Sequence, residues 1–197
     1  LGGNCKYIST KELSEQWLAK LYIHNTPHCI TAYLGARLGC TYIHESMQAA
    51  GVQKIVRGAM EEMQQMLLKK YQLDAAFVSW YAEKELARFA NALLFDPVIR
   101  VAREPFRKLG HSDRLIGAAQ LCLGSGVVPN SVCLGIMAAF FYENATDPDA
   151  NIQYLVNSLA PKDFLKIVIR LRESEALFEL LRDHWDTNLK TLKGLSK

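Results

Sequence analysis

Apolar residues recur every three or four positions along most of the chain, the spacing that places them on one face of an α-helix. The first stripe covers residues 13–22, and Ser9 with Glu12 ahead of it matches a helix capping box. Further stripes cover residues 55–71, 77–94, 115–123, 132–142, 152–159, 164–171 and 176–185. The β-branched runs at 98–101 and 127–128 are too short to build a sheet. The pattern predicts one all-α, multi-helical domain over residues 1–197.

Glycine, proline and capping residues mark the ends of several predicted helices. Gly35 and Gly39 predict close packing followed by a helix end near Cys40. Helix starts are predicted at residues 112–113, 129–131, 147–149, 161 and 174, where Ser, Asp, Asn or Pro precedes an apolar stripe.

Composition narrows the class of protein. Half of the residues are apolar, 22% are charged and the net charge is +3, which is ordinary for a soluble globular domain and too slight to favour a nucleic-acid or membrane partner. The five cysteines are odd in number and form no C-x-x-C pair, which favours reduced thiols. No signal peptide is recognisable, and no apolar run reaches the roughly 18 residues that span a bilayer. We expect a soluble, cytoplasmic protein.

Two common ligand-binding motifs are incomplete. The nearest match to the glycine-rich dinucleotide turn, residues 124–129 (GSGVVP), has proline in place of the last glycine and no strand before it. His44 and Glu45 begin a zinc motif, but Gln48 stands where its second histidine belongs. The sequence therefore predicts no metal site and no dinucleotide-binding unit of its own.

The densest group of chemically capable side chains is Lys20, Asn25 and His28. On one regular α-helix they would lie within roughly 140° of arc, with the last two about 60° apart. Pro27 is expected to kink or restart the helix, with Thr26 as its N-cap and free N–H groups near the cluster. Such residues are also common on any solvated helix face. His24 competes with His28, and nothing intrinsic separates the two.

These three residue types suit the oxidation of an alcohol without a metal. Lys20 can act as a general base if burial or nearby positive charge lowers its pKa. Asn25 can donate its amide N–H to an oxygen that gains negative charge, and His28 can orient a hydroxyl.

The segment that contains them, residues 20–35 (KLYIHNTPHCITAYLG), resembles the signature of the mannitol dehydrogenase family, the polyol-specific long-chain dehydrogenases. Further segments that resemble the family lie at 56–62 (VRGAMEE), 68–74 (LKKYQLD), 88–91 (RFAN), 103–109 (REPFRKL) and 113–116 (DRLI). The resemblance covers roughly residues 10–160. One departure is Pro27, which replaces the small residue expected before the histidine.

The resemblance implies a role for each aligned residue. Lys20 would be the general base as hydride leaves for NAD, Asn25 an oxyanion-stabilising donor, and His28 the residue that binds and orients the substrate. Family members use no metal, and their NAD is held mainly by an N-terminal nucleotide-binding domain. The sequence lacks that half, so we expect the chain to be the C-terminal substrate domain, inactive by itself.

A basic stretch follows, whose candidate substrate-binding residues are Arg100, Arg103, Arg107, Lys108 and His111. Its arginines suit phosphate recognition, although a solvated basic face or pairing with Glu104 is the alternative, and Pro105 indicates that the helix restarts there. The resemblance places Arg100 and Lys108 near substrate oxygens. It is strongest to members that interconvert mannitol 1-phosphate and fructose 6-phosphate. Free mannitol, another hexitol or a sugar acid is the alternative substrate, and a non-catalytic helical interaction domain the alternative function.

Overall fold

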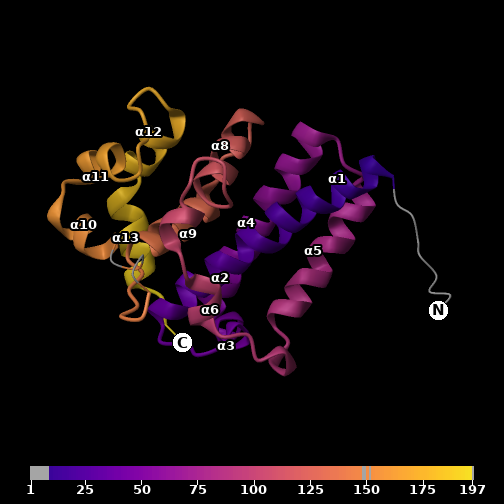
Figure 1. Cartoon of the computed structure of the whole chain (residues 1–197), viewed down its shortest axis with the longest axis horizontal. Helices are drawn as coiled ribbons and strands as arrows, with labels where there is room; N and C mark the ends of the chain where they lie inside the picture. Colours follow the sequence, from indigo (N-terminus) through magenta and orange to yellow (C-terminus); the bar gives the residue numbers. More distant parts are fainter. Residues whose placement is uncertain (1–8, 148–149, 151, 197) are drawn as a thin grey trace.

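The protein is described by a computed structural model that covers residues 9–147, 150 and 152–196 (Figure 1). Its helices, including the π-helical turns η1 and η2 and the 3-10 turn η3, are α1 (Thr10–Ala19), η1 (Lys20–Asn25), α2 (Thr26–Arg37), α3 (Ile43–Gln48), α4 (Ala50–Met66), η2 (Leu67–Tyr71), α5 (Ala75–Phe89), η3 (Ala92–Leu94), α6 (Val98–Ala102), α7 (Pro105–Lys108), α8 (Ile116–Gly124), α9 (Asn130–Phe140), α10 (Ile152–Ser158), α11 (Pro161–Ile167), α12 (Ala176–Asp183) and α13 (Trp185–Lys193). The all-α prediction is confirmed.

Most predicted helix ends fall close to the observed ones. The capping box forms, because Ser9 and Glu12 each accept a hydrogen bond from the other's backbone N–H. The starts near 130 and 161 are confirmed by α9 and α11, whereas the start at 147–149 lies partly outside the described residues. The stripe predicted over 77–94 is divided in two, since Asn91 adopts an extended conformation and caps η3 after α5 has ended.

The predicted break at Pro27 was wrong. Residues 10–37 form one continuous rod, in which α1 passes through η1 into α2. In a π-helix the hydrogen bonds run from residue i to i+5, and we attribute the accommodation of the proline to this altered register, which relieves the clash with the carbonyl of Ile23. Thr26 is not an N-cap: it has helical dihedral angles, and its hydroxyl donates to the carbonyl of Arg114 at 2.8 Å.

Helix α2 is the centre of the fold, with every residue from 29 to 35 buried. It packs against α3, α4, α6 and α9, and two glycines allow the closest approaches. A Cβ atom on Gly35 would lie 1.9 Å from the hydroxyl of Ser46, and one on Gly135 would lie 2.3 Å from the side chain of Ile30. The close packing predicted at Gly35 is thereby confirmed.

The remaining helices flank this centre on two sides. In Figure 1, α1, α4 and α5 lie on one side of α2 and α9, and α10 to α13 lie on the other. The four cysteines within the described residues are unpaired and buried, as predicted for reduced thiols. None of the described helices is long and apolar enough to cross a membrane.

Candidate active site

Lys20 and His28, two of the three predicted catalytic residues, both face α5, and the third, Asn25, shares the π-helical turn with Lys20. Lys20 is its first residue and Asn25 its last, so they stand five positions apart in a segment whose hydrogen bonds join residues five apart. That register brings them closer to one face than the roughly 140° of a regular helix would. His28 follows one turn later, in the first turn of α2.

Lys20 is exposed and lines a cavity of about 440 Å³ between α1 and α5. The other lining residues are Leu13, Gln16, Trp17, Phe77, Trp80, Tyr81 and Lys84. Two of them are unusually open for tryptophans, with Trp17 66% and Trp80 56% exposed. The burial that a general base at Lys20 requires is therefore not supplied by the described residues.

Asn25 is half-buried at the junction of η1 and α2. Its side-chain amide makes no hydrogen bond to any residue that the structure describes. Because the rod is unbroken, the free helix N–H groups expected beside the cluster do not arise. An amide without an intramolecular partner keeps its N–H groups available for a ligand oxygen.

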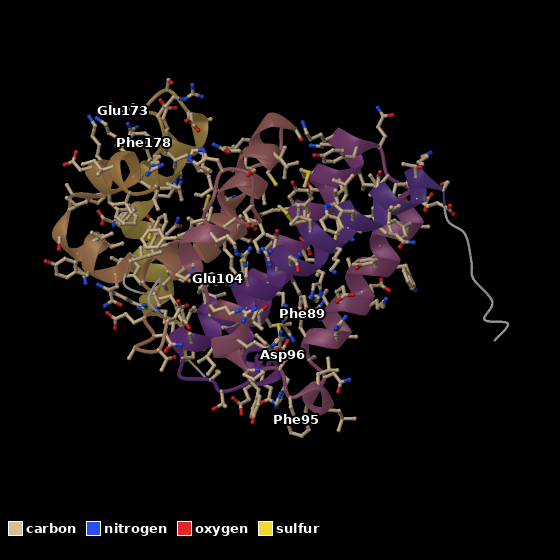
Figure 2. All side chains as sticks on the ribbon, in the orientation of Figure 1. Phe89, Phe95, Asp96, Glu104, Glu173 and Phe178 are labelled. Carbon is tan, nitrogen blue, oxygen red and sulfur yellow. The ribbon has the colours of Figure 1, made fainter. Side chains whose placement is uncertain are left out.

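His28 lines a second cavity, of about 300 Å³, where α2, α3, α5 and α6 meet. Its ring stacks on Phe89, with centroids 5.0 Å apart and planes 4° from parallel. Its Nε2 lies 2.9 Å from Oδ2 of Asp96, whose other oxygen, Oδ1, accepts from Nε of Arg100 at 3.1 Å. Figure 2 shows Phe89 and Asp96 close together where the end of α5 approaches α6.

Burial controls the protonation of this group. It lowers the pKa of His28 below its usual value, and the hydrogen bond to the Asp96 carboxylate opposes the shift only in part. For Asp96, burial raises the pKa, but hydrogen bonds from His28 and Arg100 outweigh it and the net shift is downward. The site thus favours a neutral imidazole beside an ionised carboxylate.

His24 has a different partner and a different place. Its Nδ1 lies 2.6 Å from Oε2 of Glu85, which is 1% exposed. The rings of His24 and His28 are 4.9 Å apart, and both contact Phe89. His24 does not line the cavity, which separates the two histidines that sequence alone left equivalent.

Sequence reasoning missed Glu85, Phe89 and Asp96. The signal closest to them was the matched stretch at 88–91, to which no role was given. Within the described part of the chain, no three His, Cys, Asp or Glu side chains gather as metal ligands.

The basic stretch is separated into parts by the restart at Pro105, as predicted. Arg100 lies between two cavities, because it lines both the His28 cavity and a neighbouring one of about 520 Å³. Arg103 lines only the neighbouring cavity. Arg107 is held by two carboxylates, with Nε 2.7 Å from Glu104 and Nη1 3.1 Å from Asp113.

Lys108 points into the protein, whereas His111 is exposed and bonded to the backbone. Lys108 is 3% exposed, and its ammonium donates to the backbone carbonyls of Val101, at 2.7 Å, and Arg103. Burial lowers its pKa to about 8. His111 hydrogen-bonds through Nε2 to the carbonyl of Ile169 at 3.0 Å. Neither residue lines the His28 cavity.

Comparison with known proteins agrees with this architecture. The model of the mannitol dehydrogenase C-terminal domain family matches residues 14–189, so the chain belongs to that family. It is 38% identical over 161 residues, 81% of the chain, to a mannitol-1-phosphate 5-dehydrogenase of Caldanaerobacter subterraneus subsp. tengcongensis. It is 35% identical over 167 residues, 84% of the chain, to a protein of the same name from an Exiguobacterium species.

Both relatives are longer than the chain, which spans 42% of the first and 44% of the second. Among solved structures, the ternary complex of Pseudomonas fluorescens mannitol 2-dehydrogenase with NAD and D-mannitol matches with a TM-score of 0.70. That match covers 93% of this chain and 41% of the other at 19% identity, and it supports the fold.

Proposed function

We propose that residues 1–197 form the C-terminal substrate domain of an NAD-dependent polyol dehydrogenase of the cytoplasm, which interconverts mannitol 1-phosphate and fructose 6-phosphate. The observation that supports the proposal is that Lys20, Asn25 and His28 lie on a single helical rod in a domain of this family, with Lys20 and His28 both facing α5. The names of relatives at 35% and 38% identity support the choice of substrate.

Each of the three residues has a role that its surroundings allow. Lys20 accepts the proton of the reacting hydroxyl, and Asn25 donates to the oxygen as it gains negative charge. His28 orients the polyol from the neighbouring cavity. NAD, when bound, supplies the hydride acceptor. The described residues offer no strand and glycine-rich turn to hold its pyrophosphate, so we assign its binding to a separate nucleotide-binding half.

Because Lys20 is exposed, we assign the nucleotide-binding half a second role, which is to exclude water from this lysine. A lysine in water stays protonated at neutral pH, whereas a general base must release its proton there. We propose that the nucleotide-binding half covers the cavity around Lys20, with Trp17 and Trp80 beneath it. Exclusion of water would then favour the neutral amine.

The phosphate of the substrate is assigned to two arginines of the basic stretch that line cavities, Arg100 and Arg103. Arg100 lines both the His28 cavity and the neighbouring cavity of about 520 Å³, and Arg103 lines the neighbouring cavity. Arg107 is bound to two carboxylates already, and Lys108 to two carbonyls, which leaves both less able to bind a ligand.

The test is a kinetic comparison in the dehydrogenase that contains this chain. Reduction of NAD is measured with mannitol 1-phosphate, free mannitol and a sugar acid, for the wild type and for Arg103→Ala. We expect the phosphorylated polyol to be preferred, and the substitution to lower its kcat/KM at least 10-fold while changing that of mannitol little. Preference for free mannitol would identify a different substrate. No oxidation of any polyol would support the helical interaction domain instead.

A further inference from the structure

We propose that Asp96 is the positioning residue of this site: it fixes His28 as a hydrogen-bond acceptor, through Nδ1, for a polyol hydroxyl other than the reacting one. The assignment of the ring's hydrogen bonds is a statement about this chain alone. Only the identity of the ligand rests on the proposed function.

The carboxylate of Asp96 divides its two oxygens between two partners. Oδ2 lies 2.9 Å from Nε2 of His28, and Oδ1 accepts from the guanidinium of Arg100. The side chain of Asp96 is only 18% exposed and that of His28 only 12%, so water competes little for this bond. One carboxylate thus joins two of the side chains that line the cavity, His28 and Arg100.

This bond decides which nitrogen of His28 carries the proton. An ionised carboxylate only accepts, so Nε2 must be the donor, and in a neutral ring Nδ1 is then an acceptor. Nδ1 has no partner among the residues of the structure. It is also not enclosed, because the hydroxyl of Tyr33 is the one fully buried side-chain polar atom without a partner in the described ranges. The free acceptor of His28, a residue that lines the cavity, is therefore not fully buried.

The backbone holds Asp96 in place from both sides. Phe95, just before it, adopts a left-handed conformation with φ of 44°, which turns the chain sharply after η3. The carbonyl of Asp96 accepts from the N–H of Ile43 at 2.9 Å, and two residues later Val98 donates to the carbonyl of Thr41 at 2.9 Å. The carboxylate is thus positioned before any ligand arrives, as a positioning residue must be.

The charged groups around His28 decide its protonation together. From η1 comes His24 with its partner Glu85 of α5, from α5 also Arg88, from α3 His44, and from α6 Arg100. Asp96 is the carboxylate in contact with the ring, and two arginines line the same cavity. Removal of its charge leaves the cations unopposed, so protonation of His28 becomes harder.

An acceptor at His28 has a chemical consequence. The reacting hydroxyl gives its proton to Lys20 in the proposed reaction, so it cannot donate to His28 at the same time. Once oxidised, its oxygen is a carbonyl, which has no proton to donate. His28 must therefore accept a hydrogen bond from a hydroxyl on another carbon. Both the polyol and the ketose retain such a hydroxyl.

The first measurement is the tautomer of His28 in the wild-type chain, from a long-range ¹H–¹⁵N spectrum of the labelled imidazoles between pH 5 and 8. We expect the neutral ring to carry its proton on Nε2. In Asp96→Asn we expect the pKa of His28 to fall by about one unit and the single tautomer to be lost. Asp183→Asn, which removes an exposed carboxylate paired with Arg182 on α12, should change neither. A proton on Nδ1 in the wild type would overturn the proposal, even where the Asp96 variant does not fold.

The second measurement is kinetic. In the dehydrogenase that contains this chain, Asp96→Asn should lower kcat/KM for the polyol 10-fold to 100-fold and shift its pH profile. Unchanged kinetics in a folded variant would reject the positioning role. An inactive wild-type enzyme would instead reject the proposed function and leave the tautomer result standing.

Discussion

Lys20 and His28 lie on one helical rod, yet their surroundings are opposite. His28 is stacked on Phe89, bonded to Asp96 and largely enclosed. Lys20 stands exposed between two open tryptophans. The proposed site thus has an enclosed end, around His28, which the chain completes with its own carboxylates. It also has an open end, around Lys20, which the described residues leave exposed.

The difference shows which functional properties this chain contains and which it lacks. Orientation of a ligand needs fixed hydrogen bonds, and the α5–α6 region supplies them to His28. A lysine that acts as a general base needs a site without water, which the described surface around Lys20 does not provide. Substitutions at the two ends should therefore differ in kind: those at the enclosed end should affect stability as well as activity, and those at the open end activity alone.

The largest expected effect is that of Lys20→Ala on catalysis. Loss of a general base should lower kcat about 10²-fold to 10⁴-fold in the dehydrogenase that contains this chain. The free energy of unfolding of the chain should change by less than about 0.5 kcal/mol, because the side chain is exposed. Steady-state NAD reduction and urea unfolding measure the two effects. Lys84→Ala, in the same cavity, is the matched control, and equal losses in both variants would reject Lys20 as the base.

The next effect belongs to the enclosed end. Glu85→Ala removes the partner of His24 and leaves that ring half-buried without its 2.6 Å bond. Removing one partner of such a buried hydrogen bond costs about 1 to 3 kcal/mol of unfolding free energy, measured by urea denaturation. Glu83→Ala, two residues earlier on the exposed face of α5, should cost less than about 0.5 kcal/mol. Similar values for both would show that the pair contributes little.

A third effect concerns pH and the buried Lys108. Its pKa is lowered from 10.5 to about 8, so between these values the unfolded chain binds more protons than the folded one. Stability should consequently rise with pH across this window, by an amount on the order of 3 kcal/mol from this group. Unfolding curves at pH 8 and pH 10.5 measure the rise. The comparison is Lys108→Met, in which this contribution should vanish, and an identical rise in that variant would contradict the assignment.

The smallest effect on stability is expected at the open end. Trp17→Gln should change the unfolding free energy by less than about 0.5 kcal/mol, because this side chain is 66% exposed. Trp185→Ala, in a tryptophan only 7% exposed, should cost about 3 to 5 kcal/mol. If the nucleotide-binding half covers Lys20, Trp17→Gln should nevertheless reduce activity of the dehydrogenase. A neutral result there would argue against coverage of this surface.

Much of the fold was predictable because helical periodicity is a local signal. The capping box at Ser9 and the starts of α9 and α11 follow from residues adjacent in sequence. The unbroken rod was not predictable, since Pro27 is a helix breaker in a regular helix, and the π-helical turn that accommodates it has no reliable sequence pattern.

Of the candidate site, the sequence predicted only the residues of one motif. That motif of fixed spacing makes Lys20, Asn25 and His28 candidates, all on one helical rod. Their partners come from elsewhere in the chain: Glu85 is 61 residues from His24, and Asp96 is 68 residues from His28. Pairings over such separations depend on packing. The same limit applies to the basic stretch, where Arg100 and Arg107 both pair with nearby acids, but only the packing shows that Arg100 also lines a cavity.

The π-helical turn also sets the angular phase between the two ends of the rod. A regular α-helix advances about 100° per residue, so the same residues wound as ordinary helix would set Lys20 and Asn25 roughly 140° apart and rotate everything before them. Lys20 would then project from another flank of the rod, and α1 would lose its alignment with α5. The π-helical register therefore links the direction of the lysine side chain to that of the histidine through backbone geometry alone.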